Sequence, residues 1–423
     1  MMQFFAICFI LSAREGFSQE PAFFLKNGQK ILFLGDSNTF AGEYITNIDG
    51  YLFTRFPDQI FELINLGLSS ETISGCSEAD HPFPRPNVQN RLTKALEKIK
   101  PDIVFLCYGM NDGIYSPFDE NRFKAYQEGT KKALKLIRSA RAIPILLTPP
   151  PFDPVPIKKR TLGENQKNHS YKSPYVRYDE EVLQKYSDWL LTLKSNTQMV
   201  IDLHGPMKEY IESQRLQNPN YRLSGDGIHF NSIGHLIICK EILHALHAPA
   251  LVDLGEFGTM KPMENIREYT DKNGLYRFRW KTKLPMPINP KITNEQIESI
   301  QLYGKLDALM LRGQFIQSEQ YRFYMNGKEI SKISGEELSG GANLTRISKM
   351  PFNEQSKQLW PVIQKRRQLI GTAWLSEVGS DHPNTPKGKP LQEAIIEAKK
   401  LREEILEKTQ PQEYLIELKP INK

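Results

Sequence analysis

The chain has 423 residues, enough for two or three domains of about 150 residues each. With 39% hydrophobic and 25% charged residues, its composition is that of a globular protein, which excludes wholesale disorder. The net charge of +6 is spread along the chain, so no nucleic-acid-binding surface is expected. The four cysteines (Cys8, Cys76, Cys107 and Cys239) are too few and too scattered for a disulfide scaffold or a zinc site.

Residues 4–13 form an apolar stretch that is too short to span a bilayer but suits the core of a signal peptide. The small residues Gly16 and Ser18 offer a cleavage site, so we expect a signal peptide over residues 1–18 and export to the periplasm or beyond the cell. A buried strand is the alternative, and the protein is then cytoplasmic. No later apolar run approaches the ~20 residues of a membrane span.

Residues 28–248 alternate between short apolar runs and amphipathic stretches. Each run is bounded by Gly, Pro, Asn or Asp, as buried parallel strands are. The runs cover residues 31–34, 61–64, 103–107, 143–147 and 199–203. This alternation predicts a three-layer α/β domain with a five-stranded parallel sheet.

The pattern changes after residue 249. Period-two alternation predicts strands at 276–280 and 321–325, with a hairpin turn at Asn326-Gly327, and further strands at 300–303 and 309–315. We therefore expect a small antiparallel β module over 250–345. Residues 346–423 are expected to be a helical tail, interrupted by a loop at 379–390 and ending in a strand at 414–418.

Chemistry is indicated first by Gly35-Asp36-Ser37, which follows the first predicted strand. A serine on the turn after a buried parallel strand is exposed at the carboxyl edge of the sheet, where such domains bind ligands. Taken alone, a serine in this position is more often the N-cap of a helix than a nucleophile.

Three further motifs lie later in the same domain. Gly67 follows the second strand and Asn111 follows the third; a backbone N–H and an amide are suitable donors for an oxyanion hole. Asp226 and His229, three residues apart on a loop, can pair so that the carboxylate orients the imidazole. Each has a plain structural alternative, but together they indicate a nucleophilic site at one sheet edge.

These four blocks, in this order and spacing, resemble the SGNH hydrolase superfamily, also called GDSL esterases and lipases. The resemblance covers about half of the chain, and implies the flavodoxin-like fold of that superfamily. It implies Ser37 as nucleophile, His229 as general base and Asp226 as the residue that orients His229. It further implies an oxyanion hole made by the Ser37 N–H, the Gly67 N–H and the Asn111 side chain, with no metal or organic cofactor.

Several other residues leave alternatives open. His204, with Asp202 beside it, is the one serious rival base, although a structural role fits it better. Trp280, Trp360 and Trp374 could stack on sugars or lie in the core. The long segment 148–178, which carries Lys158-Lys159-Arg160, is expected to contribute to specificity.

The sequence thus predicts a serine esterase acting on an O-acyl ester, with the acetyl ester of a carbohydrate as first candidate. Its partner is a small-molecule or glycan ester substrate, with no nucleic acid and no integral membrane segment, and the oligomeric state stays open. The alternative is a non-catalytic glycan-binding or scaffold protein with a vestigial site, whose function resides in residues 250–423.

Overall fold

The structure is a computed structural model. The predicted signal peptide lies outside the described residues, so export stays a prediction. No helix in the described part of the chain is both long and apolar enough to cross a membrane. The described residues are 22–195, 197–257, 266–272, 275–302, 306–315, 319–347 and 349–421.

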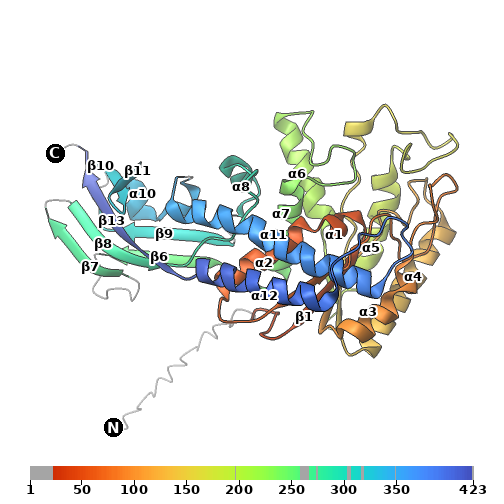
Figure 1. Ribbon diagram of the computed structural model, residues 1–423. Helices are drawn as coiled ribbons and strands as arrows, with labels where there is room; N and C mark the ends of the chain where they lie inside the picture. Colours follow the sequence, from red (N-terminus) through yellow and green to blue (C-terminus); the bar gives the residue numbers. More distant parts are fainter. Residues whose placement is uncertain are drawn as a thin grey trace, which may run out of the picture.

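A five-stranded parallel sheet forms the centre of the N-terminal half (Figure 1). Its order is β2-β1-β3-β4-β5, the flavodoxin-like order of doubly wound folds, which confirms the predicted fold class. In this order the chain reverses direction across the sheet between β1 and β3, so the loops after these strands flank one crevice. The strands are β1 (Lys30–Gly35), β2 (Glu62–Asn65), β3 (Ile103–Cys107), β4 (Ile143–Leu147) and β5 (Met199–Ile201).

Helices cover both faces of this sheet. Successive side chains of β1 enter opposite cores: Ile31 and Phe33 join one, Leu32 and Leu34 the other. On the first face lie α2 (Glu43–Arg55), α6 (His204–Gln217) and α7 (Ser232–Ala245). On the second face lie α3 (Leu92–Ile99), α4 (Glu120–Ser139) and α5 (Gln184–Thr192), the last preceded by a π-helical turn at Asp179–Leu183.

The second part of the chain is a β module with two sheets. One is antiparallel, in the order β11-β10-β13-β8-β7, and the other has the order β12-β9-β6. The sequence predicted an antiparallel module. The structure departs from this prediction in one place, because β6 and β9 pair in parallel. The strands are β6 (Leu251–Phe257), β7 (Ile266–Lys272), β8 (Leu275–Thr282), β9 (Asp307–Gly313), β10 (Gln320–Met325), β11 (Lys328–Ser334), β12 (Ala342–Asn343) and β13 (Gln412–Pro420).

The C-terminal strand β13 lies in the middle of the antiparallel sheet, between β10 and β8. Its alternate residues Ile416 and Leu418 are fully buried in the module's core. The turn at Asn326-Gly327 joins β10 to β11 with φ of 50° and 79°, the positive values that a type I′ hairpin needs. Residues that the sequence assigned to a tail therefore complete the module.

The strand expected at 300–303 is wrong for the residues that the structure describes there. A capping box, Thr293 with Gln296, starts the short helix α8 (Asn294–Ser299), and the chain continues into a turn. A second short helix, α10 (Gly335–Gly340), precedes β12. Trp280, Trp360 and Trp374 are all buried, so none offers a sugar-stacking surface.

Two long antiparallel helices, α11 (Pro351–Val378) and α12 (Leu391–Lys408), join the two parts. Figure 1 shows α11 running from the β module alongside the α/β domain, with α12 beside it. α11 packs against α2 and the edge strand β2, and Trp360 Nε1 donates to Asn47 Oδ1 at 2.8 Å. Arg366 Nη1 also pairs with the buried Asp49 at 3.0 Å. The tail is therefore fixed to the α/β domain.

The central place of β13 predicts that Ile416→Ala lowers the stability of the β module by about 2–5 kcal/mol, because it opens a cavity in a closed core. Glu417→Ala, on the partly exposed face of the same strand, should change it by less than about 0.5 kcal/mol. Urea unfolding followed by tryptophan fluorescence, which reports on the buried Trp280, measures both. Equal effects of the two substitutions would contradict the placement of β13.

Candidate active site

Ser37 is the first residue of the short helix α1 (Ser37–Ala41), directly after β1. Asp36 caps this helix: its Oδ1 accepts from Asn38 N at 3.0 Å. A Cβ at Gly35 would lie 2.2 Å from Thr39 Oγ1 and 2.8 Å from Cys107 O, so only glycine permits this tight entry to the helix. The half-exposed Ser37 is therefore held at the carboxyl edge of the sheet.

Three predicted side chains form a chain of short contacts. His229 Nε2 lies 2.8 Å from Ser37 Oγ, and His229 Nδ1 lies 2.6 Å from Asp226 Oδ2. The second oxygen of Asp226 accepts from the backbone N–H groups of Ile228 and His229 and from the hydroxyl of Ser224. The carboxylate is thus fixed and leaves one oxygen for the imidazole.

The electrostatics of this chain favour a charged imidazole. The hydrogen bond that the His229 ring donates to Asp226 raises the pKa of His229 above its ordinary value, against the effect of partial burial. Burial alone would raise the pKa of Asp226, but hydrogen bonds from the His229 side chain and from the backbone hold it well below its usual range. Burial raises the pKa of the nearby Asp36 to about 6.

Asn38 joins the two segments that carry Ser37 and His229. Its Nδ2 donates to Ile228 O at 3.0 Å, and its Oδ1 accepts from Phe230 N at 3.2 Å, so the amide binds the residues on both sides of His229. The side chain is buried. Sequence reasoning missed Asn38; its position beside Ser37 was the one available indication.

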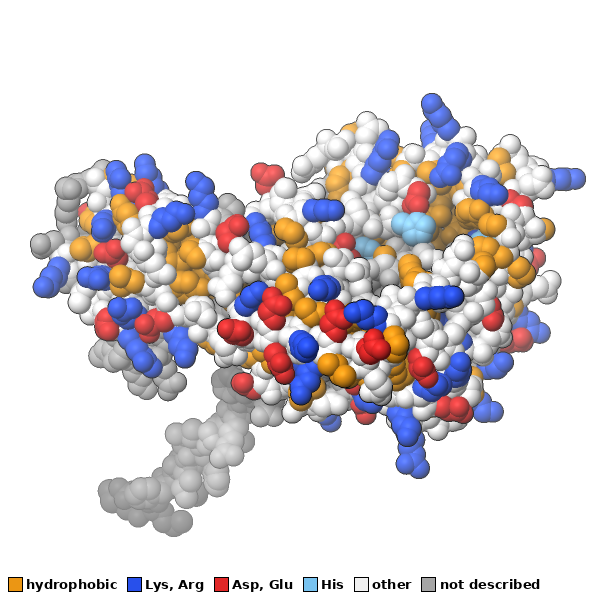
Figure 2. Space-filling view, viewed as in Figure 1, with side chains coloured by type: hydrophobic (Ala, Val, Ile, Leu, Met, Phe, Trp, Pro, Cys, Tyr) orange, Lys and Arg blue, Asp and Glu red, His pale blue; other side chains and the backbone are white. Residues whose placement is uncertain are grey.

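A cavity of about 300 Å³ opens over Ser37. Figure 2 shows histidine side chains at the surface of a hollow in the α/β part, while acidic and basic side chains are intermixed elsewhere on that face. The lining is polar near Ser37 and aromatic farther away. It comprises Ser37, Ser69, Ser70, His81, Pro82, Phe83, Arg85, Asn111, Tyr115, Tyr171, Ile228 and His229.

Asn111 lies in this cavity, as predicted from the sequence. Its Nδ2 donates to Glu71 O at 3.1 Å, which leaves the second hydrogen of the amide for the cavity. Its Oδ1 accepts from the hydroxyl of Tyr115 at 2.8 Å, and this fixes the orientation of the amide. Glu71 itself is buried against Arg91 and Tyr108, which makes the support rigid.

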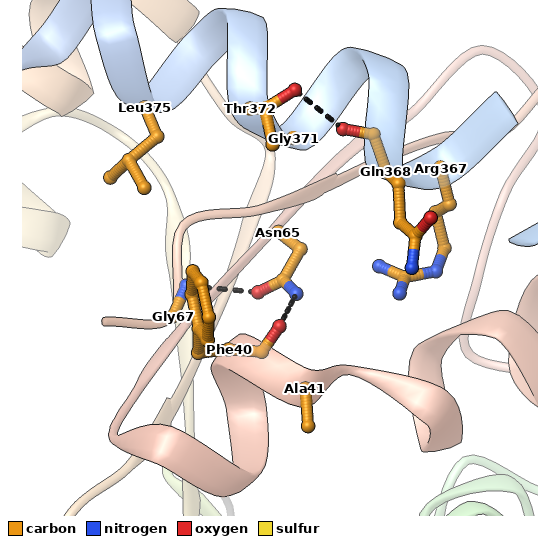
Figure 3. Close-up of a pocket in the computed structure, with 9 residues that line it drawn as sticks. All are labelled: Phe40, Ala41, Asn65, Gly67, Arg367, Gln368, Gly371, Thr372 and Leu375. Carbon is orange, nitrogen blue, oxygen red and sulfur yellow. Dashed lines mark hydrogen bonds between the residues drawn. The ribbon is translucent and has the colours of Figure 1, made fainter. Parts of the chain in front are cut away.

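Gly67 does not lie in this cavity, and the expectation that its N–H faces the site does not fit the structure. The N–H donates to Asn65 Oδ1 at 2.9 Å (Figure 3). A Cβ on Gly67 would lie 2.3 Å from Phe40 N, so glycine is needed here for close packing against the back of α1.

Ser70, three residues after Gly67, lines the cavity with φ of +62°, a conformation uncommon for a residue other than glycine. No described residue accepts a hydrogen bond from its N–H, whereas its carbonyl accepts from Arg85 Nη1 at 3.3 Å. Nothing in the sequence indicated that Ser70 would line the cavity.

Arg85 is a further cavity residue that the sequence did not indicate. It is nine-tenths buried and forms a two-pronged pair with Glu78, at 2.5 and 2.7 Å. Its guanidinium lies over the ring of Tyr115 at 5.5 Å. Arg85 therefore connects two residues of the cavity wall, Ser70 and Tyr115, to the buried Glu78 behind it.

The C-terminal tail supports the same wall from outside. In the loop between α11 and α12, His382 packs edge-on against Phe83, with ring centroids 4.8 Å apart. Asn90 Nδ2 donates to the neighbouring Asp381 at 2.6 Å. The cavity wall therefore depends on residues from both halves of the chain.

His204, the alternative base that the sequence offered, does not lie at the cavity over Ser37. The buried His204 contacts Asp179 at 3.1 Å, in the wall between α6 and the π-helical turn, and does not line the cavity. Of the long segment 148–178, Tyr171 lines the cavity, whereas Lys158, Lys159 and Arg160 are exposed away from its lining. Within the described ranges, no group of three or more His, Cys, Asp or Glu side chains could hold a metal ion.

Comparison with known proteins gives a family for the α/β domain. Residues 33–237 match the family described as GDSL-like Lipase/Acylhydrolase. A search of curated proteins finds no match. A gut microbial diltiazem-metabolizing enzyme, BT4096, has a similar structure: 17% identity, TM-score 0.72, 94% of this chain and 98% of that chain. The fold is therefore shared over nearly the whole chain, including the β module and the helical pair.

Smaller proteins match over the α/β domain. They include a catalytic mutant of Axe2, an acetylxylan esterase from Geobacillus stearothermophilus (18% identity, TM-score 0.40, 53% of this chain and 96% of that chain). A GDSL-like lipase from Parabacteroides merdae gives 15% identity and a TM-score of 0.36, over 54% of this chain and 100% of that chain.

Proposed function

Since residues 33–237 belong to the GDSL-like lipase/acylhydrolase family and the protein is a serine esterase of the SGNH type, we propose that Ser37, His229 and Asp226 carry its reaction. The observation that supports this most strongly is the contact chain from Ser37 Oγ through His229 to Asp226, at 2.8 and 2.6 Å. A serine hydroxyl is a weak nucleophile at neutral pH, and a neutral imidazole at this distance can take its proton during attack.

The first half of the reaction forms an acyl-enzyme. Ser37 Oγ attacks the ester carbonyl and its proton moves to His229 Nε2, while Asp226 stabilises the imidazolium. The tetrahedral intermediate collapses, the bond to the alcohol breaks, and His229 returns the proton to the leaving oxygen. In the second half, water attacks the acyl group by the same steps in reverse order, and Ser37 is released.

The developing oxyanion needs fixed donors in the cavity. We propose the N–H of Ser37, the N–H of Ser70 and the Asn111 amide, with Ser70 in place of Gly67. The supporting facts are the cavity positions of all three residues and the engaged N–H of Gly67. Tyr115 and Arg85 act as positioning residues, the first on the Asn111 amide and the second on the Ser70 carbonyl.

The substrate that this cavity suits is a short-chain ester of a polyhydroxy alcohol, such as an acetylated carbohydrate. A cavity of about 300 Å³ accommodates a small acyl group, and its outer wall presents the rings of His81, Phe83 and Tyr171 beside the Arg85 guanidinium. Rings with polar neighbours suit a sugar, which has both apolar faces and hydroxyl groups. The complete contact chain at Ser37 gives no support to a vestigial site.

We predict that the protein hydrolyses p-nitrophenyl acetate and that Ser37→Ala lowers kcat by at least about 10³-fold, because the acyl-enzyme cannot form. Liberated nitrophenolate measures the rate, and a thermal unfolding scan of both proteins checks that the variant is folded. Acetylated xylo-oligosaccharides should be turned over faster than p-nitrophenyl octanoate. Equal rates for the two proteins would end this proposal.

The pKa of His229 predicts the pH dependence. The base must be neutral, so kcat/KM should rise with pH as His229 loses its proton, with a midpoint above the ordinary value of 6.5. Asp226→Asn removes the largest cause of the raised pKa. The midpoint should therefore move to lower pH, and the maximal rate should fall by about 10⁴-fold. NMR titration of the His229 ring checks the same shift without activity. An unchanged midpoint in the variant would contradict the assignment of the base.

The oxyanion donors can be tested with a boronic acid, which forms a tetrahedral adduct on a reactive serine. In a crystal structure of the adduct on Ser37, one boronate oxygen should lie about 2.7–3.1 Å from Ser70 N and from Asn111 Nδ2. Gly67 N should still donate to Asn65. A boronate oxygen bound to Gly67 N instead would restore the assignment that the sequence suggested.

A further inference from the structure

A second cavity, of about 290 Å³, lies behind α1, between this helix, the end of β2 and α11. None of its lining residues lines the cavity over Ser37. Figure 3 shows a polar side formed by Arg367, Gln368 and Asn65 and an apolar side formed by Phe40 and Leu375. The lining residues are Phe40, Ala41, Asn65, Gly67, Arg367, Gln368, Gly371, Thr372 and Leu375.

Arg367 is a buried cation without a carboxylate partner. The residue is only 3% exposed, and no described acidic side chain lies within ion-pair distance of its guanidinium. Its Nε donates to Thr46 Oγ1 at 2.8 Å and its Nη2 to Gly42 O at 2.6 Å, both neutral acceptors. Its Nη1 is buried and has no acceptor among the described residues.

The surroundings neutralise this charge only in part, because Asp49 is shared between two arginines. The nearby Asp49 is paired with Arg366 at 3.0 Å, and Arg366 itself adds a second positive charge. Burial lowers the pKa of Arg367 to about 10, and the charge of Asp49 opposes this effect only in part. Burying a charge without an ion-pair partner is unfavourable, and an anion held in the adjacent cavity would offset part of this cost.

We propose that this cavity binds a small organic carboxylate. The carboxylate group accepts hydrogen bonds from Arg367 and from the exposed amide of Gln368, and the hydrocarbon part lies against Phe40 and Leu375. Inorganic anions would meet the charge but not the apolar side, so an organic acid fits the whole lining better. Phe40 and Ala41 belong to α1, the helix that begins at Ser37, so the ligand contacts the back of that helix. This binding goes beyond the proposed ester hydrolysis and does not depend on it.

Isothermal titration calorimetry with hexanoate and its neutral analogue hexanamide tests the proposal. Hexanoate should bind the full-length protein, and hexanamide should bind at least about tenfold more weakly, because a charge-assisted hydrogen bond is lost. Arg367→Gln should weaken hexanoate binding by a similar factor. Thr372→Trp, at a half-exposed position of the lining, should abolish it by filling the cavity and serves if Arg367→Gln does not fold.

The matched control is Tyr171→Ala, which alters the cavity over Ser37 and should leave hexanoate binding unchanged. Failure of hexanoate to bind at millimolar concentration, equal binding of the amide, or binding insensitive to Thr372→Trp would each overturn the proposal. Because calorimetry does not require activity, these results are independent of the proposed esterase reaction.

Steady-state kinetics show whether hexanoate bound behind α1 affects the reaction at Ser37. If hexanoate raises the KM for p-nitrophenyl acetate in the unaltered protein and Thr372→Trp removes this effect, the ligand behind α1 is coupled to the active site through that helix. If hexanoate binds without changing KM, it is a separate ligand of the protein. Competition that is equal in both proteins places hexanoate at Ser37 and contradicts the proposal.

Discussion

Two hydrogen bonds from the buried amide of Asn38 hold together the two segments on which the candidate active site depends. Ser37 belongs to the first strand–helix turn of the domain, and His229 to the loop before α7, 192 residues later. Asn38 binds the backbone on both sides of His229, so this backbone cannot move away from α1 without breaking these bonds, and Asp226 holds the imidazole itself. The short contact at Ser37 is therefore a property of the fold and not of two flexible loops.

The rest of the site is fixed by buried charge pairs rather than by the sheet itself. Glu71, paired with Arg91, accepts from the Asn111 amide through its carbonyl, and Arg85, paired with Glu78, donates to the Ser70 carbonyl. Removing one partner of such a pair leaves an uncompensated buried charge, which costs about 3–5 kcal/mol. Ser70 can thus be held in a left-handed conformation that its own preference does not favour.

The second half of the chain is integrated with the first. Arg55 of α2 forms a buried ion pair with Asp307 of β9, and the carboxylate of Asp307 also accepts from Met286 N at 2.7 Å. Helix α11 crosses from the β module to the edge strand β2, and the loop that follows it reaches Phe83 in the cavity wall. Along this path Arg367 is the one buried arginine of α11 that pairs with no described acidic residue.

Much of the fold could be predicted from the sequence because hydrophobic period and strand–helix alternation are local. The same reasoning brought Ser37, Asn111 and Asp226–His229 to one sheet edge, since loops after parallel strands share that edge. It failed for Gly67, because glycine was taken as the donor by residue type, whereas its lack of a side chain serves packing against Phe40. Ser70 could not be found, because a positive φ in a serine leaves no mark in the sequence. The alternation at 414–418 did indicate a final strand that could return to the β module, but its pairing with β8 and β10 is set by contacts distant in the chain.

The central claim is that Ser37 is a nucleophile activated by His229. Labelling with a fluorophosphonate, followed by peptide mass spectrometry, tests it most directly, because the reagent reacts covalently with activated serines. The account predicts a label on Ser37 in the unaltered protein and a strongly reduced rate of labelling in His229→Ala. A label on another residue, or equal rates of labelling in the two proteins, would contradict it.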